Sequence, residues 1–349
     1  MELLPTIWFI AIAVLWTGYL FLEGFDLGVG MLMKIFARNN TERRVLLNTI
    51  GPVWDGNEVW LLTAGGATFA AFPFWYASLF SALYLPLLLV LVALIFRAVA
   101  FEYRGKVDTD RWRNTWDWAI AAGSFLAAFG VGAALALTTT GLPLDANGDR
   151  DGGPFSWFNG YALLGGFAVA GFALLHALAF LALKTDGDVR HRARRWFVRL
   201  LPVLLLPLAG WAVSVQLLSG EAWTVAVLAV AVVAAAAAWL QARRGNEGRA
   251  FLAVGVFLLC GSASIFGAVF PVVLPSTIDP AFSLTISNAS SSDYTLGLMS
   301  IVACVGLPLV IAYQAWTYWV FRRRVSASHI PEAHSFLPAV AAKAFTRND

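Results

Sequence analysis

The sequence predicts an all-α protein embedded in a membrane, and its composition and the length of its apolar blocks lead to that prediction. Of the 349 residues, 59% are hydrophobic and only 13% are charged, whereas soluble domains carry roughly 25% charged residues. The apolar residues come in blocks of about 20 or more, the length at which a helix crosses a bilayer. No linker is long enough for a separate soluble domain, so we expect one transmembrane domain over residues 1–349.

Nine apolar blocks are expected to form spanning helices. The first is too long for a cleavable signal peptide and lacks its basic head, so we expect it to be retained. The connections are polar or rich in Pro and Gly, which is typical of loops, and a tail over 323–349 follows the last block. The expected helices cover about 6–36, 49–72, 75–104, 117–141, 156–184, 196–218, 221–243, 249–272 and 293–322.

Basic residues sort between alternate connections, and this sorting predicts the orientation. One set of connections is rich in Lys and Arg, from Lys34 and Arg38 in the first to Arg322 and Arg323 in the last, whereas the other set contains only Arg150. Cytoplasmic loops are enriched in Lys and Arg, so we expect the N-terminus outside, the C-terminus in the cytoplasm and an odd number of spans. The net charge of +3 therefore reflects topology and contact with anionic lipid, not nucleic acid.

Charged residues lie within the expected spans, mainly on the cytoplasmic side. A charge near the bilayer centre costs roughly 2.5–3.5 kcal/mol on insertion scales, so these side chains must face one another, a partner or water. Asp55 and Glu58 are one helical turn apart, and Arg97 is the natural counter-ion for one of the acids. The candidate site residues are Glu23, Asp26, Asp55, Glu58, Arg97 and Asp117.

Three interpretations of these charges remain open from the residues alone. They can form a structural ion-pair network that fixes the first four helices together. They can form a proton path that begins with Asp55 and Glu58, since acids one turn apart can pass protons through water. They can also bind a substrate or a cation. Asp117 either contributes to the cytoplasmic mouth of this region or caps the fourth helix, because acids favour helix starts.

The remaining motifs argue against nucleotide and metal sites. GFDLGVG resembles a phosphate loop, but it lies within an apolar helix and follows no strand; Gly24 and Gly28 instead allow close helix packing. Cys260 and Cys304 are isolated in separate blocks, so no zinc site is expected. His176 is the only histidine within an expected span. It cannot supply a bis-histidine haem site, and a lone hydrogen-bonded histidine or a five-coordinate haem ligand remain as alternatives.

Several long motifs resemble subunit II of the cytochrome bd-type quinol oxidases. They are GFDLGVGML, GPVWDGNEVWLLTAGGATFAAFP, FRAVAFEYR, RWRNTWDW, FPVVLPSTIDPAFSLTISNASSSDYTL and AWTYWVF. The resemblance covers the first 120 residues and roughly 265–322. It implies nine helices arranged as two four-helix bundles plus one peripheral helix, in the inner membrane of a bacterium.

The resemblance also implies a function and a set of partners. The family pairs with subunit I, which carries two haems b and one haem d, oxidises quinol and reduces oxygen to water without pumping protons. Some members have a small accessory subunit, and some hold a structural quinone in this subunit. The resemblance leaves menaquinol and ubiquinol both open as the substrate.

The resemblance assigns roles to individual residues. Asp55 occupies the position of the aspartate that marks a proton-uptake route from the cytoplasm in the family. Asp26, Arg97 and Asp117 match other implicated positions, whereas Glu58 replaces the amide of better-known members. Two rival functions stay open beside the oxidase subunit: a stand-alone secondary transporter, which also uses intramembrane acids, and a structural partner that carries no protons.

Overall fold

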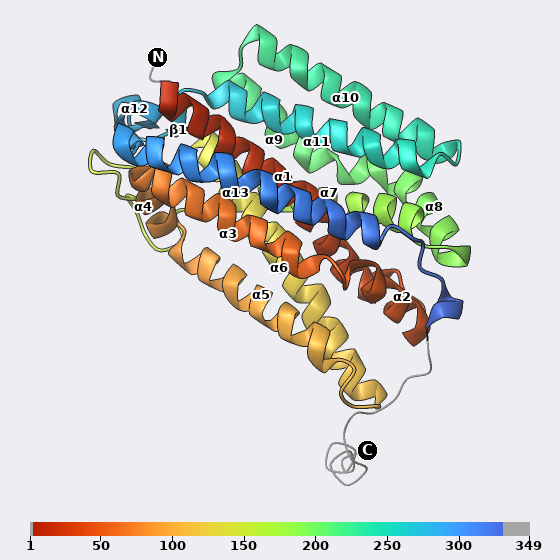
Figure 1. Ribbon diagram of the computed structural model, residues 1–349. Coiled ribbons are helices and arrows are strands. Elements are labelled where there is room, and N and C mark those ends of the chain that lie inside the picture. Colours follow the sequence, from red (N-terminus) through yellow and green to blue (C-terminus); the bar gives the residue numbers. More distant parts are fainter. Residues whose placement is uncertain (1–2, 331–349) are drawn as a thin grey trace.

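Long helices that run side by side along one direction make up the protein in the computed structural model, which describes residues 3–330 (Figure 1). Helices α1 (Leu3–Ile35) and α7 (Gly160–Lys184) lie in the middle. On one side are α10 (Ala222–Arg243) and α11 (Glu247–Val269), and on the other are α5 (Tyr84–Tyr103) and α6 (Asp110–Thr140). The part of the expected tail beyond residue 330 lies outside the described residues.

Two expected helices are each divided in two, and one expected connection contains a helix. The third expected helix becomes α4 (Pro73–Ala82) and α5, and the sixth becomes α8 (Gly187–Leu204) and α9 (Leu206–Ser219). The second, expected over 49–72, corresponds to α3 (Trp54–Ala71), and a break separates it from α2 (Asn40–Ile50), which lies mostly in the connection expected before it. Each break lies close to a proline, namely Pro52, Pro86 and Pro207. Proline has no backbone N–H to donate and therefore interrupts a helix.

The fourth expected helix starts earlier than the sequence predicted. Helix α6 begins at Asp110, where the side chain of the preceding residue, Thr109, accepts a hydrogen bond from the backbone N–H of Trp112. Asp117 is thus two turns inside the helix and does not cap it, so the capping interpretation of Asp117 was wrong.

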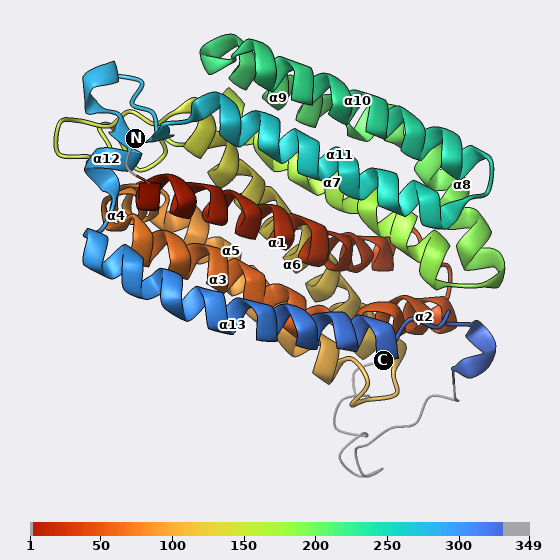
Figure 2. The same cartoon turned by 45° about the horizontal axis from the view of Figure 1, so that its top comes forward.

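Eight helices in the described part of the chain are long and apolar enough to cross a membrane, with α8 and α9 counted as one. Helix α3 is not among them. It is 18 residues long and carries two acids and several small or polar residues, yet it runs beside α1 and α13 (Asp293–Val320) in both views (Figures 1 and 2). The count of nine spans, the two-bundle arrangement and the orientation of the termini therefore remain predictions.

Close packing of α1 on α7 forms the centre of the molecule. Gly28 of α1 faces the backbone of Ala173, and a Cβ atom at Gly28 would collide with that carbonyl oxygen. Gly24 lies one turn earlier, where a Cβ would make ordinary contact with Phe172. Small residues allow two backbones to approach each other within a membrane, and here they fix α1, the helix that carries two of the candidate acids.

A short compact segment joins α11 to α13 at one end of the molecule. It contains the antiparallel strands β1 (Val272–Leu274) and β2 (Leu284–Thr285), the 3₁₀ helix η1 (Pro280–Phe282) and α12 (Ile286–Ala289). After this segment α13 returns along α3, and a further 3₁₀ helix, η2 (Ala327–His329), follows it. Helix α13 is the least buried of the apolar helices, with 6% of its most apolar window covered.

A charged cluster between four helices

Helix α1 supplies two completely buried acids. Glu23 and Asp26 are three residues apart, so they lie on one face of the helix, and both side chains have no exposed surface. The two carboxyl groups are close enough to influence each other electrostatically. Buried acids on one face require a counter-charge or a shared proton, because an isolated charge in an apolar interior is strongly unfavourable.

Arg97 of α5 provides that counter-charge and joins three helices. Its Nη2 atom lies 2.8 Å from Oε1 of Glu23, and its Nη1 atom lies 3.1 Å from Oε2 of Glu58 on α3. Arg97 is fully buried, whereas the Glu58 side chain is 21% exposed. The guanidinium also lies 5.1 Å from the ring centroid of Phe101. One arginine therefore links an acid at the surface to an acid in the interior.

Asn57 is a second junction, which the sequence analysis missed. Its Nδ2 atom donates to Oδ2 of Asp26 at 2.6 Å and to the carbonyl oxygen of Leu22 at 3.1 Å. Its Oδ1 atom accepts from Nε2 of Gln314 at 2.8 Å and from the hydroxyl of Tyr318 at 2.9 Å. Gln314 and Tyr318 belong to α13, so this buried amide connects α1, α3 and α13.

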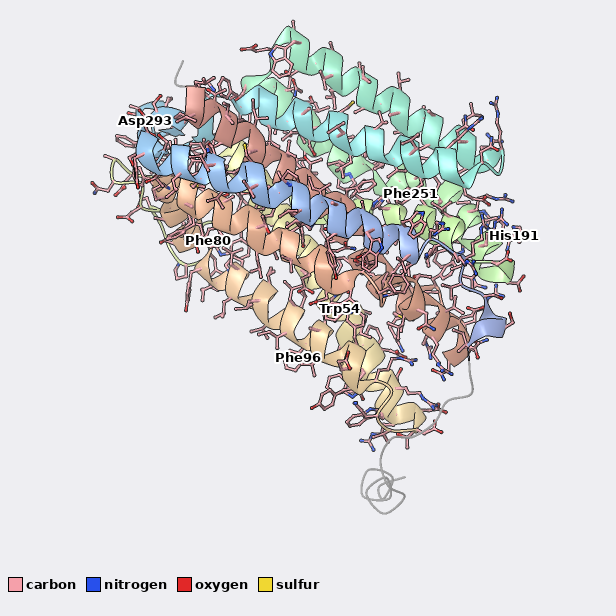
Figure 3. The ribbon with its side chains drawn as sticks, in the orientation of Figure 1. Trp54, Phe80, Phe96, His191, Phe251 and Asp293 are labelled. Atoms are coloured by element: carbon pink, nitrogen blue, oxygen red, sulfur yellow. The ribbon has the colours of Figure 1, made fainter. Side chains whose placement is uncertain are left out.

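Asp55 lies apart from these contacts. It is the second residue of α3, is exposed, and forms no ion pair in the described part of the chain. Its neighbour Trp54, labelled in Figure 3, packs on Phe101 with ring centroids 4.9 Å apart. Asp55 thus lies on the outer side of α3, one turn before the partly exposed Glu58.

Asp117 belongs to a separate cluster on the same side of the molecule. It is fully buried, and its carboxylate lies 2.6 Å from Nε of Arg104 and 3.5 Å from Nε of Arg43. Arg104 also donates to Oδ1 of Asn40 at 2.8 Å. Arg104 and Arg97 are seven residues apart on α5, about 10 Å along the helix, so the structure does not bring Asp117 into contact with the other candidate acids.

Ion pairs on the expected cytoplasmic side join the two halves of the chain. Arg192 of α8 contacts Glu42 of α2 at 2.5 Å, and Arg190 donates to both carboxylate oxygens of Glu247 at 3.0 Å. Partial burial raises the pKa of Glu42, but the hydrogen bonds from Arg192 and from the backbone N–H of Arg38 outweigh it, so the pKa of Glu42 lies below its usual value.

His176 is completely buried among aromatic rings. Its Nε2 atom lies 2.8 Å from the carbonyl oxygen of Phe21, and its ring stacks on Phe172 and Phe251 with centroids 5.3 and 5.1 Å apart. These contacts describe a hydrogen-bonded histidine packed among aromatic rings, and its Nδ1 atom is buried without a hydrogen-bond partner among the described residues. Within residues 3–330 no group of three or more His, Cys, Asp or Glu side chains is arranged to hold a metal ion.

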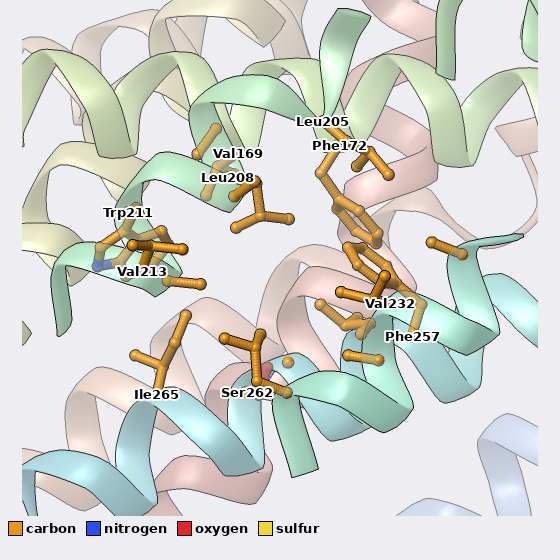
Figure 4. Close-up of a pocket in the computed structure, with 18 of the residues that line it drawn as sticks. Val169, Phe172, Leu205, Leu208, Trp211, Val213, Val232, Phe257, Ser262 and Ile265 are labelled. Atoms are coloured by element: carbon orange, nitrogen blue, oxygen red, sulfur yellow. The ribbon is translucent and has the colours of Figure 1, made fainter. Parts of the chain in front are cut away.

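An apolar cavity of about 290 Å³ lies between α7, α9, α10 and α11 (Figure 4). Its walls include Phe172, Leu208, Trp211, Val232 and Phe257, and Ser262 supplies the only hydroxyl group among the lining residues. The indole N–H of Trp211 donates to Thr139 at 3.0 Å. A cavity with this lining can accept an aliphatic or isoprenoid chain, but it offers little to bind a polar group.

These features define a multi-pass helical membrane protein with charged side chains buried between its helices. The chain belongs to the cytochrome bd terminal oxidase subunit II family, whose model matches residues 4–321. The resemblance noted in the sequence motifs is thereby confirmed. Membership also places the chain in a bacterial membrane and in a quinol oxidase complex, and it favours an oxidase subunit over a stand-alone transporter.

Individual relatives agree with this assignment over nearly their whole length. Cytochrome bd ubiquinol oxidase subunit 2 of Bacillus subtilis is 42% identical over 334 residues, which cover 93% of this chain and 98% of the relative. Cytochrome bd-I ubiquinol oxidase subunit 2 of Escherichia coli is 36% identical over 94% of this chain and 97% of the relative. A chain of the bd oxidase from Geobacillus thermodenitrificans has the same fold, with a TM-score of 0.73 at 18% identity over 92% of this chain and 99% of that chain.

Proposed function

We propose that this chain pairs with a haem-bearing subunit I in a quinol oxidase and supplies cytoplasmic protons for the reduction of oxygen to water. Each oxygen molecule takes up four electrons and four protons, and the protons must cross low-dielectric protein to reach the reaction. The two haems b and the haem d, which would carry the electrons, are assigned to subunit I. In this proposal the carboxyl groups of the present chain only accept, hold and release protons.

The observation that carries this proposal is the link that Arg97 makes between Glu58 and Glu23. The acids form a series from the exposed Asp55, through the partly exposed Glu58, to the buried Glu23 and Asp26. Glu23 and Glu58 both pair with the single guanidinium of Arg97, and Asp26 lies one turn from Glu23. The acids outnumber the positive charge, so a proton taken up by the cluster would reduce its excess negative charge. Asp117, paired with Arg104 and Arg43, is proposed to maintain the cytoplasmic mouth of this route.

The outer face of α3 supports subunit I as the partner. Exposed residues recur along it at helical spacing: Asp55, Gly56, Val59, Leu62, Thr63, Gly66 and Phe69. A carboxylate on a lipid-facing surface would be costly, and neither Gly56 nor Gly66 would bring a Cβ atom within 4 Å of another described group. A helix of subunit I that lies on this face would cover the carboxylate and could approach closely at both glycines.

The apolar cavity supports the tail of a structural quinone as its occupant. The lining residues Phe172, Leu208 and Val232 would contact an isoprenoid chain, which the surrounding helices shield from water. The names of the relatives point to ubiquinol as the substrate of those proteins, and the same class of quinol is proposed here. A small accessory subunit and bound membrane lipid complete the set of expected partners.

The proposal is tested with the Asp55→Asn variant of the assembled complex. Oxygen uptake with quinol is expected to fall about a hundredfold, the lower end of what proton-transfer groups contribute, while the haem absorption per complex stays normal. Asp293→Asn, an exposed acid at the start of α13 and thus at the other end of the bundle (Figure 3), is the matched control and should retain full activity.

Two outcomes would overturn the proposal. Wild-type turnover in Asp55→Asn would remove this residue from the proton route. Loss of haem absorption together with turnover would show that the acid maintains assembly, as the structural-partner alternative requires.

A further inference from the structure

We propose that Asn57, Gln314 and Tyr318 are positioning residues that fix which oxygen of Asp26 can take up a proton. The proposal rests on the proposed function, because it assigns a role to residues beside the acids of that route. The proton is assigned to Oδ1 of Asp26. Two residues of α13 orient the amide of Asn57, and that amide occupies the other oxygen, Oδ2.

The side chain of Trp60 can only donate a hydrogen bond. The indole N–H of Trp60 lies 2.8 Å from Oε1 of Gln314, and an indole has no acceptor atom for a hydrogen bond. The amide of Gln314 must therefore present its oxygen to Trp60, which leaves its NH₂ group facing Asn57. The orientation of Gln314 is thus determined by chemistry.

The hydrogen-bond partners of Asn57 likewise determine the orientation of its side-chain amide. Its Oδ1 atom faces the NH₂ group of Gln314 and the hydroxyl of Tyr318, and its Nδ2 atom faces the carbonyl oxygen of Leu22. Turning the amide over would place NH₂ against NH₂ and oxygen against oxygen. All four hydrogen-bonding positions of the amide are occupied in only one orientation, and this orientation directs an N–H group at Asp26.

Asp26 consequently has two different oxygens. Oδ2 accepts the hydrogen bond from Asn57 at 2.6 Å. Oδ1 is buried, and among the described residues it has no hydrogen-bond partner. When Asp26 takes up a proton, Oδ1 is the oxygen that has no donor on it, so the proton binds there. Asn57 then stabilises the remaining carbonyl oxygen, Oδ2.

Infrared difference spectroscopy of the purified complex measures this assignment. The carboxyl C=O band of Asp26 is identified by its loss in Asp26→Asn. Asn57→Leu, which is similar in volume but has no donor, should move this band to higher wavenumber because Oδ2 loses its hydrogen bond. Turnover should fall about tenfold, which corresponds to about 1.4 kcal/mol, the order of one hydrogen bond.

Milder variants separate positioning from folding. Tyr318→Phe removes one hydroxyl and Gln314→Leu removes one amide, and each should shift the Asp26 band in the same direction but less than Asn57→Leu. Thr317→Val is the matched control, since Thr317 lies on the same helix and bonds only to the carbonyl oxygen of Tyr313 at 3.1 Å. The control should leave the band and the rate unchanged.

The outcomes distinguish this proposal from the proposed function. An unshifted band in Tyr318→Phe and Gln314→Leu, with normal haem absorption, would overturn the orientation of Asp26 described here. Wild-type turnover in Asp26→Asn would instead remove Asp26 from the proton route, while a band shift in the α13 variants would still support the orientation.

Discussion

Arg97 is the residue on which the charged cluster depends most directly. Its guanidinium is fully buried and contacts one carboxylate on α1 and another on α3. Breaking a buried ion pair by removing one partner leaves an uncompensated charge. The neighbouring acids would then have to bind protons or draw water into the bundle.

Arg97→Leu is therefore expected to destabilise the protein by about 3–5 kcal/mol. Thermal unfolding of the purified complex measures the loss. The double variant Arg97→Leu/Glu23→Gln should recover much of the stability, because it removes the charge that was left without a partner. Equal stability of the single and double variants would show that Glu23 is not the acid that Arg97 compensates.

His176 provides a contrasting prediction at the same scale. Its contacts are two stacked rings and one backbone carbonyl oxygen, so His176→Phe should cost only about 1 kcal/mol, the net contribution of one hydrogen bond. The haem absorption of the assembled complex should be unchanged. Loss of a haem signal in this variant would support the alternative that His176 is an axial haem ligand.

At the scale of the elements, the contact between α1 and α7 determines where the acids lie. A side chain at Gly28 would collide with the backbone of α7, which would move α1 and with it Glu23 and Asp26. Helices α8 and α9, by contrast, are separated by a break flanked by Pro202 and Pro207, and residues around this break line part of the apolar cavity. Helices α1 and α7 are therefore closely packed, whereas the break between α8 and α9 borders an open space.

Gly28→Val is expected to destabilise the complex by roughly 1–3 kcal/mol through overpacking. Gly306→Ala is the control, because a Cβ at Gly306 in α13 meets nothing within 4 Å among the described residues. It should be neutral or slightly stabilising, since alanine is favoured over glycine inside a helix. Thermal unfolding of both variants checks the difference, and equal losses would contradict the close packing of α1 on α7.

For the whole molecule, the ion pairs on the expected cytoplasmic side join α2 to α8 and α8 to α11. Glu42 lies outside the helices that can span a membrane, and its pKa is lowered in the folded protein. The lowered pKa means that folding favours the ionised carboxylate. Its contribution to stability is complete above the unfolded pKa, which is about 4.3, and it is lost as the pH falls through the lower, folded value.

Glu42→Gln should consequently reduce the free energy of unfolding by about 1 kcal/mol near pH 7 and by progressively less below about pH 4. Stability curves of the wild type and the variant, measured in detergent across this range, should converge at low pH. A difference that grows on acidification would contradict the ion pair with Arg192 as the source of the stabilisation.

The sequence predicted that the charged residues would cluster, but it did not predict all of their individual contacts. The cost of charge in a bilayer required Glu23, Glu58 and Arg97 to have partners, and Arg97 contacts both acids. Asn57, Gln314 and Tyr318 escaped notice because their pairing depends on α13 lying against α3, and residues 257 and 261 positions apart show no signal of it. The prolines Pro52, Pro86 and Pro207 favour the helix breaks that lie near them. The breaks were not predicted because the apolar residues continue across them.

The way α13 is held has a consequence for how the subunit is made. This helix rests on the bundle with little buried apolar surface, and Gln314 and Tyr318 anchor it to a buried amide. The ribosome produces it after all the other long helices. A chain interrupted before α13 would lack the contacts of Gln314 and Tyr318 with Asn57, so the synthesis of α13 completes the cover over this buried amide.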